Sequence, residues 1–482
     1  MEWLPLEVVE LVAEYLTSKD LAACCAVSVS WRHIFNQDRV WKPHCNKGIA
    51  DYLETAVCQV QPGFVSPVMK NNTLSPVCHW WMCFMRQNHL LNNWRENRCI
   101  IHKVELETED LLSPFEFIYT FISHGYVIGF TSMRVMLWDV RNTPVYLRDP
   151  FCLPRNYKVC WCGMVSENMF FVVQKQCLQV YHFNTIFDDK WDLIHMFLLD
   201  GDETLSPSEV GNRRRYMLRH MLVIGNIFVG CNTRDEAVLH VWNVEEGKKL
   251  RRIECTMVSD SHTRIHRLVK SGKLSLDFVI ILETKLIKTY RYSLKVYSLK
   301  ELDFFKFSVS HDMPFYLSED TFNCVLQDRF VAFTINGFNY VYNYLTSQLV
   351  VTSTPAHSLS VDCSCDVLAV GNRILFSENL KFNMVFNTNT LLITPLIVSN
   401  ARNVPEEHDF TKSLTGNFFI TQTGSKCNLW EMGRHSRLDS VTWLSSLKFC
   451  FTILSMCEIN KSCTKVVLAD IVENCFLVVS FW

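Results

Sequence analysis

The sequence predicts a small all-α domain, a helical linker and then a long all-β region with the architecture of a β-propeller. Three observations lead to this prediction. Short apolar runs separated by helix-capping residues fill residues 1–45, and a second helical pattern lies within residues 46–98. Residues 99–482 then repeat one strand-ending pattern at intervals of 43 to 61 residues. A repeat of this length, built from strand-sized pieces, is typical of a propeller.

The first predicted element is a helix over residues 4–16. Pro5 suits the first turn of a helix, because its missing N–H needs no partner there. Glu7, Glu10 and Glu14 form a polar stripe along this segment, and the remaining positions are mainly apolar. This pattern is typical of an amphipathic helix.

Two further short helices are predicted before residue 36. Thr17 and Asp20 have the spacing of a capping box, which indicates that a helix begins there and continues over residues 21–27. A third segment at residues 28–35 contains Trp31. So small a unit cannot bury this much Leu, Val and Trp, and we therefore expect it to expose apolar surface that a partner covers.

The linker over residues 46–98 divides into two parts. Proline residues interrupt its first part, and residues 77–98 then show the spacing of apolar and polar residues that predicts a helix. A helix in this position would connect the N-terminal domain to the β region.

The repeat consists of apolar residues, an aromatic residue and then a small polar or acidic residue. Its instances are Leu137-Trp138-Asp139, Val180-Tyr181, Val241-Trp242-Asn243, Val296-Tyr297-Ser298, Val341-Tyr342-Asn343, Val385-Phe386-Asn387, Leu429-Trp430-Glu431 and the degenerate Val478-Val479-Ser480. Eight blades would give about 48 residues each and seven about 55, and the usual period of about 40–45 favours eight while seven stays open. The last blade lacks an outer strand, which we expect residues 100–106 to supply.

Several residues near the N-terminus have the identity and spacing that are typical of a known module. They are Leu4-Pro5-x-Glu7, Tyr15-Leu16, Asp20-Leu21, Val27, Trp31-Arg32 and Trp41. In this spacing the segment resembles the F-box, which docks on the Skp adaptor of cullin–RING ubiquitin ligases. The resemblance implies that Leu4, Pro5, Leu16 and Leu21 face the adaptor. We expect Trp31 and Trp41 to form the internal core and the connection to the following segment. The alternative is an unrelated three-helix bundle.

The linker and the repeat extend this resemblance. Arg86-Gln87 and Asn93-Trp94-Arg95 stand where F-box/WD40 proteins carry such residues before their first blade. The chain departs from the family in having no Gly-His pair, and it has Trp-Asp in the repeat only at residues 138–139. It therefore resembles a divergent branch of the F-box/WD40 family, with an F-box at 1–45, a linker at 46–98 and a WD40-like propeller at 99–482.

Composition and motifs argue against several other classes of protein. The net charge of −2 gives no basic field for nucleic acid, and no apolar run of 18 residues predicts a membrane span. The N-terminus does not read as a signal peptide, so we expect a cytoplasmic and/or nuclear protein. The 21 cysteines include no CxxC pair, and no nucleotide-binding or HExxH motif occurs. We therefore expect no cofactor, no metal site and no catalytic residue.

One charged segment is a candidate substrate site. The long interval between the second and third repeats contains Arg213, Arg214, Arg215 and Arg219. Arginines on a propeller loop would suit an acidic or phosphorylated target. The alternative is a solvated insertion without a binding role.

The function predicted from these patterns is that of a non-catalytic receptor. By the resemblance, the F-box docks on the Skp adaptor and through it on the cullin–RING core, while the propeller binds a protein substrate for ubiquitination. An adaptor-bound scaffold without a ubiquitylation substrate is the alternative. A propeller enzyme is disfavoured, because no catalytic motif is clustered in the sequence.

Overall fold

The computed structural model describes most of the chain, and the description below concerns only those residues. Residues 5–482 are described except for 46, 67–75, 106–118, 124, 131–133, 148–150, 153–158, 167, 175–176, 184–190, 199–217, 233–236, 256–262, 271–276, 301–304, 314–322, 336–337, 354–366, 379–380, 400–409, 414–417, 424–425, 436–437, 449–453, 460–461 and 471–474. The chain divides into two compact units. The first contains Met1–Glu105, Cys457–Ala469 and Cys475–Trp482, and the second contains Leu106–Met456 and Asp470–Asn474.

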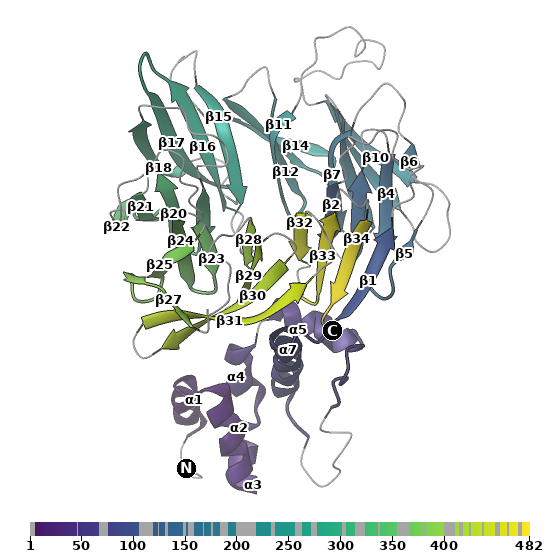
Figure 1. The fold of residues 1–482 in the computed structure, drawn as a ribbon, viewed down its shortest axis with the longest axis vertical. Coiled ribbons are helices and arrows are strands. Elements are labelled where there is room, and N and C mark those ends of the chain that lie inside the picture. Colours follow the sequence, from purple (N-terminus) through teal and green to yellow (C-terminus); the bar gives the residue numbers. More distant parts are fainter. Residues whose placement is uncertain are drawn as a thin grey trace. The chain divides into compact units, whose positions relative to one another are not determined.

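All the described helices belong to the first unit (Figure 1). They are α1 (Leu6–Glu14), α2 (Ser18–Val27), α3 (Val29–Phe35), α4 (Asp38–Trp41), η1 (Lys42–His44), α5 (Lys47–Thr55) and α7 (His79–Arg95). The three predicted short helices and the predicted linker helix are therefore confirmed. Among these helices, none combines the length and the apolar character that a membrane span needs.

Local capping explains where the helices begin. The Thr17 hydroxyl accepts a hydrogen bond from the Asp20 N–H at 3.2 Å, and the Asp20 carboxylate accepts one from the Thr17 N–H at 3.0 Å. The Thr17 hydroxyl also donates to the Asp20 carboxylate at 2.6 Å, and this bond together with the one from the Thr17 N–H lowers the pKa of the Asp20 carboxyl. Ser28 caps α3 in a similar way, by accepting a hydrogen bond from the Trp31 N–H. The capping box predicted from the sequence is therefore confirmed.

The β region forms eight sheets, and in six of them consecutive strands lie side by side. Each of the other two contains one strand paired out of sequence order, β1 with β34 and β27 with β31, and the β27–β31 pair is parallel. The first four sheets contain β2 (Tyr119–Ser123), β3 (Tyr126–Phe130), β4 (Arg134–Asp139), β5 (Val145–Tyr146) and β6 (Phe151–Cys152); β7 (Val159–Ser166), β8 (Met169–Gln174), β9 (Cys177–Phe183) and β10 (Trp191–Leu198); β11 (Leu218–Ile224), β12 (Ile227–Asn232), β13 (Val238–Asn243) and β14 (Lys248–Glu254); and β15 (Thr263–Lys270), β16 (Asp277–Lys285), β17 (Tyr290–Ser298) and β18 (Phe305–Met313).

The remaining sheets continue this arrangement. They contain β19 (Cys324–Gln327), β20 (Phe330–Ile335), β21 (Phe338–Asn343) and β22 (Gln348–Ser353); β23 (Val367–Val370), β24 (Arg373–Glu378), β25 (Lys381–Asn387) and β26 (Leu392–Pro395); β27 (Ile397–Ser399), β28 (Phe410–Ser413), β29 (Phe418–Thr423), β30 (Lys426–His435) and β31 (Leu438–Lys448); and β1 (Ile100–Glu105) with β32 (Leu454–Ile459), β33 (Lys465–Asp470) and β34 (Cys475–Ser480). The fold is thus a short helical region followed by an eight-bladed β-propeller, and the prediction of eight blades is confirmed.

The sequence repeat marks the same strand in every blade. Each apolar–aromatic–polar motif lies in the third strand of its own sheet, namely β4, β9, β13, β17, β21, β25, β30 and β34. The predicted closing strand is confirmed as well. β1 pairs antiparallel with β34, from Ile100 opposite Ser480 to Glu105 opposite Cys475. A strand that precedes the other blades in the sequence therefore forms the outer edge of the last one.

Phenylalanine fills the interior of the blades. The chain has 33 Phe but only 16 Gly. Fully buried Phe side chains occupy the second strand of five consecutive sheets, as Phe170, Phe228, Phe278, Phe330 and Phe376. Apolar packing between neighbouring sheets therefore stabilises blades that lack the Gly-His pairs of regular repeats.

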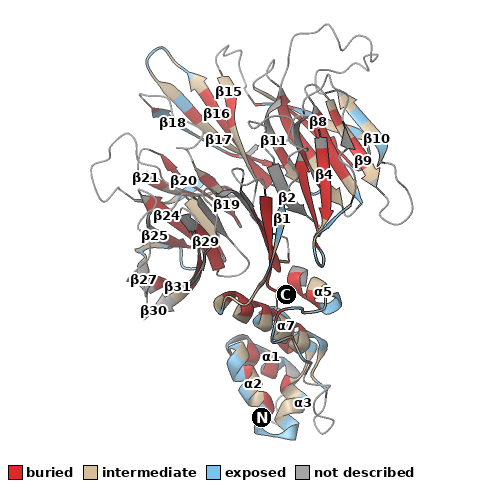
Figure 2. Ribbon diagram, turned by 45° about the vertical axis from the view of Figure 1, so that its right-hand side comes forward, coloured by how far each residue is buried: buried red, intermediate tan, exposed pale blue. Residues whose placement is uncertain are grey.

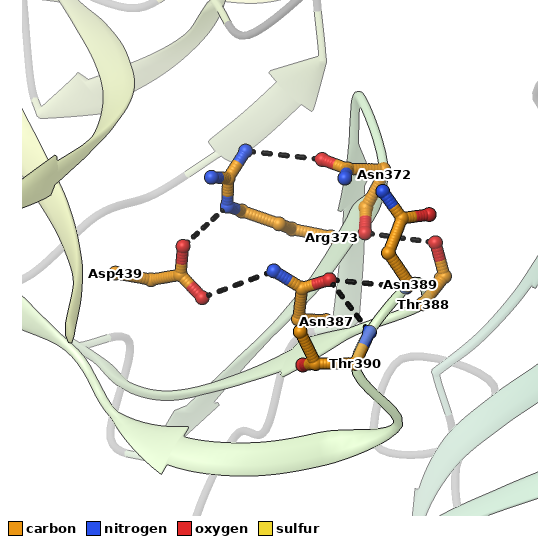
Figure 3. Close-up of polar contacts among 7 residues, drawn as sticks. All are labelled: Asn372, Arg373, Asn387, Thr388, Asn389, Thr390 and Asp439. Carbon is orange, nitrogen blue, oxygen red and sulfur yellow. Dashed lines mark hydrogen bonds and ion pairs between the residues drawn. The ribbon is translucent and has the colours of Figure 1, made fainter. Parts of the chain in front are cut away.

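A buried polar network joins two neighbouring blades of the second unit (Figure 3). Arg373 on β24 donates from Nε to the Asp439 carboxylate on β31 at 2.7 Å. Its Nη1 donates to the Asn372 side chain at 3.0 Å, and Asn387 Nδ2 donates to the second carboxylate oxygen of Asp439. Both charged side chains are more than nine-tenths buried. Their mutual pairing is what allows these two charges to lie inside the protein.

Removing one partner of this pair is expected to destabilise the second unit. Asp439→Ala would leave the Arg373 charge buried, and breaking a buried pair costs roughly 3–5 kcal/mol. We expect about 3 kcal/mol, because Asn372 still accepts a hydrogen bond from Arg373. Chemical denaturation of the full chain measures this change. The double variant Arg373→Met/Asp439→Leu is the control and should recover most of the loss; equal losses in both variants would contradict the account.

Candidate functional site

Helices α1 to α4 pack around a small apolar core that includes Trp41. Leu21, Phe35 and Trp41 are fully buried, and Val9 and Cys25 are nearly so. The Trp41 ring stacks on the Trp81 ring of α7 at a centroid distance of 4.8 Å, and its Nε1–H donates to the Phe35 carbonyl. Trp41 therefore lies in the core as predicted, whereas Trp31 is only half-buried.

Side chains near α4 fix the start of the linker helix. The Asn36 side chain donates to the Pro76 carbonyl at 2.7 Å and accepts a hydrogen bond from the Cys78 N–H at 2.6 Å. The Asp38 carboxylate accepts a hydrogen bond from the Trp80 N–H at 3.0 Å. Because these contacts satisfy N–H groups of the first turn of α7, the linker helix is tied directly to the N-terminal helices.

One side of α1 exposes an apolar stripe. Val8, Leu11 and Tyr15 recur at a spacing of three and four residues, and Tyr15 is 88% exposed. Val27 and Val29 are also exposed, where α2 ends and α3 begins. Figure 2 shows exposed stretches of ribbon on these helices. We call Val8, Leu11 and Tyr15 the apolar stripe. The apolar surface that the composition predicts is therefore present on this unit.

The residues predicted to face an adaptor occupy different environments. Pro5 is exposed at the start of α1, and Leu16 is half-buried against the core. Leu21 is 0% exposed, so its side chain supports the core and is not available for a contact with a partner. Leu4 lies outside the described residues. The exposed positions that sequence reasoning missed are those of the apolar stripe, which a helical-wheel plot of residues 6–15 would have separated from the acidic stripe.

A family comparison agrees with this arrangement of helices. Residues 1–47 match the F-box-like family. The chain therefore carries an F-box-like domain at its N-terminus, and the apolar stripe lies on the first helix of that domain. No curated protein sequence matches the chain.

Several solved structures show a limited similarity to this chain. The C-terminal WD40 domain of Sif2 shares 13% identity and a TM-score of 0.46, over 75% of this chain and 96% of that chain. A chain of the mitotic checkpoint complex shares 8% identity with a TM-score of 0.41, over 79% of this chain and 90% of that chain. U3-55K shares 9% identity with a TM-score of 0.40, over 79% of this chain and 98% of that chain. These similarities are low, and the strand order of the eight sheets carries the fold assignment.

The linker helix joins the F-box-like domain to the last blade within the first unit. The Asn93 side chain donates to the Phe481 carbonyl at 2.9 Å, and Trp94 Nε1–H donates to the Cys463 carbonyl at 2.9 Å. The Trp94 and Phe481 rings stack at 3.6 Å, and Trp482 donates from its indole to the Ala56 carbonyl. Buried hydrogen bonds and stacking together make this a specific connection rather than a flexible tether.

Two thiols near the F-box-like domain, Cys45 and Cys83, have raised pKa values. Cys83 Sγ lies 3.6 Å from His79 Nε2, and His79 Nδ1 lies 3.6 Å from Glu54 Oε1. This sequence of thiol, imidazole and carboxylate resembles a cysteine nucleophile with its base and the group that orients the base. Cys83 is buried, however, and burial raises its pKa. Burial likewise raises the pKa of Cys45 to about 12. These thiols therefore stay protonated at neutral pH.

The predicted arginine cluster cannot be assembled from the structure. Arg213, Arg214 and Arg215 lie outside the described residues. Arg219 belongs to β11, the strand that begins at Leu218. Within the part of the chain that the structure describes, no group of three or more His, Cys, Asp or Glu side chains could hold a metal ion.

Proposed function

We propose that the protein is a substrate receptor of a Skp–cullin–F-box ubiquitin ligase. The observation that carries this proposal is the apolar stripe on α1 of the F-box-like domain, which the domain's own core does not cover. A surface of this kind on so small a domain suits a stable protein partner. We further propose that the chain belongs to the branch of the F-box/WD40 family typified by F-box and WD40 domain-containing protein 12.

The proposed mechanism is proximity rather than catalysis. The F-box-like domain would bind the Skp adaptor, and through it the cullin–RING core, while the propeller would hold the substrate. The hydrogen bonds of Asn93 and Trp94 keep the F-box-like domain attached to the last blade. Such a connection raises the effective concentration of substrate lysines near the ubiquitin-loaded enzyme.

Polar substitution of the apolar stripe tests the adaptor contact. The triple variant Val8→Gln/Leu11→Gln/Tyr15→Gln is expected to reduce co-purification with the Skp adaptor by more than about 100-fold. Large apolar side chains contribute roughly 1.5–3 kcal/mol each when a partner buries them fully, so partial burial of three suffices for this loss. Quantitative pull-down from cells expressing the full chain measures the effect.

A matched control uses the acidic side of the same helix. Glu7 is exposed on α1 and lies outside the stripe, so Glu7→Gln should leave the adaptor contact nearly unchanged. The triple variant should keep the unfolding temperature of the parent, because its substitutions are at the surface. Undiminished co-purification of a folded triple variant would contradict the proposed adaptor contact.

The scaffold alternative makes a different prediction. If the protein is a receptor, proteins bound to the propeller should be ubiquitylated at fewer lysines when the triple variant replaces the parent. Ubiquitin-remnant proteomics on matched cell lines measures this change. Unaltered ubiquitylation, together with a lost adaptor contact, would support a scaffold without a ubiquitylation substrate.

A further inference from the structure

The hairpin formed by β16 and β17 is longer than its counterparts. Its two strands pair at nine positions, from Asp277 opposite Ser298 to Lys285 opposite Tyr290. The corresponding hairpins of the other sheets in the second unit pair at five or six described positions. At about 3.4 Å per residue, three extra pairs extend this hairpin by roughly 10 Å.

Neighbouring strands support the extra length. β18 pairs with β17 as far as Met313 opposite Tyr290, so the extension has a third strand along most of its length. Arg291 donates from Nε to Asp312 at 2.7 Å and from Nη2 to its other carboxylate oxygen at 3.2 Å. The Thr263 and Thr284 hydroxyls form a hydrogen bond at 2.9 Å on the other side. Strand pairing and side-chain hydrogen bonds on both sides therefore hold the end of the hairpin in place.

The turn itself carries an apolar residue between two lysines. Leu286 N–H donates to the Thr289 carbonyl at 2.8 Å and closes the turn. Ile287 is 102% exposed, which means that no other part of the chain covers it. Lys285 and Lys288 are exposed on either side of it. Turns usually carry Gly, Asn, Asp, Ser or Pro, so an isoleucine at this position has no local structural reason.

Among the residues that the structure describes, neither Lys285 nor Lys288 forms an ion pair. The nearest acidic residue in the sequence, Glu283, is buried, and its carboxylate is paired with Arg264 at 3.2 Å and lies 3.3 Å from His266 Nδ1. The turn therefore carries two lysines, neither of which pairs with a described acidic residue, around one apolar side chain.

We propose that this turn, residues 285–288, is a docking site for an acidic segment of a partner protein that also carries an apolar residue. The partner's carboxylate or phosphate groups would pair with Lys285 and Lys288, and Ile287 would pack on its apolar side chain. The proposal rests on the proposed function, in which this partner is the ubiquitylation substrate. Charge complementarity selects an acidic partner, and the braced hairpin limits the conformational entropy lost on binding.

A protein is favoured over a membrane surface by the size of the turn. One isoleucine offers much less apolar area than a single acyl chain, which itself gives only marginal membrane binding. Two lysines add little to this attraction. A protein segment, by contrast, can also form contacts with the flanking strands.

Photo-crosslinking from the turn tests this proposal. We would place p-benzoylphenylalanine at position 287 of the full chain in cells, and at position 345 as a control. Leu345 is also an exposed apolar residue in a turn, between β21 and β22. Mass spectrometry of the crosslinked peptides should show acidic or phosphorylated segments at position 287 and not at 345. Lys285→Glu/Lys288→Glu should lower the crosslink yield at 287 by about tenfold.

Three results would overturn the proposal. They are equal yields at positions 287 and 345, crosslinked segments without acidic residues, and yields at 287 that survive the charge reversal. Lipid adducts in place of peptides would likewise overturn it in favour of a membrane contact. Adaptor co-purification and ubiquitin remnants are measured in the same samples. Acidic partners that are captured but not ubiquitylated would count against the proposed function alone, and ubiquitylated partners that avoid position 287 would count against this docking site alone.

Discussion

Replacing residues 99–106 with an eight-residue Gly-Ser segment is expected to lower the unfolding temperature by roughly 5–10 °C and to cause aggregation. β1 covers the edge of β34 through six register pairs, and every residue of β34 is buried. Losing these hydrogen bonds, at about 1 kcal/mol each, would remove roughly 5 kcal/mol and leave an unpaired strand edge. Thermal unfolding and light scattering of the purified chain measure both effects.

A control for this replacement uses the outward side of β1. Ile101 and Lys103 are exposed there, so Ile101→Thr/Lys103→Thr changes the side chains and keeps the strand pairing. We expect that variant to stay within about 1 °C of the parent, because surface substitutions away from special features have small effects. If the Gly-Ser replacement remained soluble at the parental unfolding temperature, β1 would contribute nothing to the last blade.

Trp41→Ala is expected to unfold the F-box-like domain and abolish co-purification with the Skp adaptor. The indole is fully buried, stacks on Trp81 and donates a hydrogen bond to the Phe35 carbonyl. Substituting Ala for a buried Trp costs roughly 3–5 kcal/mol, which is comparable to the whole stability of so small a domain. Limited proteolysis of the full chain should then cleave within residues 5–45 at low protease concentration.

Two further substitutions test whether packing of the Trp41 ring accounts for the protease resistance of the domain. Trp41→Phe keeps a ring against Trp81 but removes the hydrogen bond, so we expect intermediate protease resistance. Val29→Ala changes a residue that is exposed on α3 and should preserve the resistance of the parent. A Trp41→Ala protein as resistant as the parent would show that the stacked indoles do not hold the domain together.

Features that depend on neighbours in the sequence were predictable from it. The Thr17–Asp20 capping box is a local exchange of hydrogen bonds across three residues, and it forms as its spacing indicates. The repeated motifs fix the third strand of each blade, because their period is a property of the chain itself. The closing role of β1 also followed from counting strands, since the last blade was one strand short.

The availability of individual side chains was not predictable in this way. Leu21 and Leu11 are both leucines on short amphipathic helices, yet Leu21 is fully buried and Leu11 is exposed. Which of them faces the core depends on how α1, α2 and α4 pack on one another. A resemblance to a family transfers the positions of such residues, but packing decides their exposure.

By itself, the sequence determined the class of this protein: a short helical domain, a linker helix and a series of repeated β units, because capping, amphipathic spacing and repeat period are encoded locally. Only the tertiary structure decided which surfaces are free to bind. β18 pairs with β17 as far as the end of the hairpin, and within the described chain Glu283 pairs with Arg264 and not with Lys285 or Lys288. Exposure and charge pairing are properties of contacts between residues distant in the sequence, so they arise only when the strands and helices pack together.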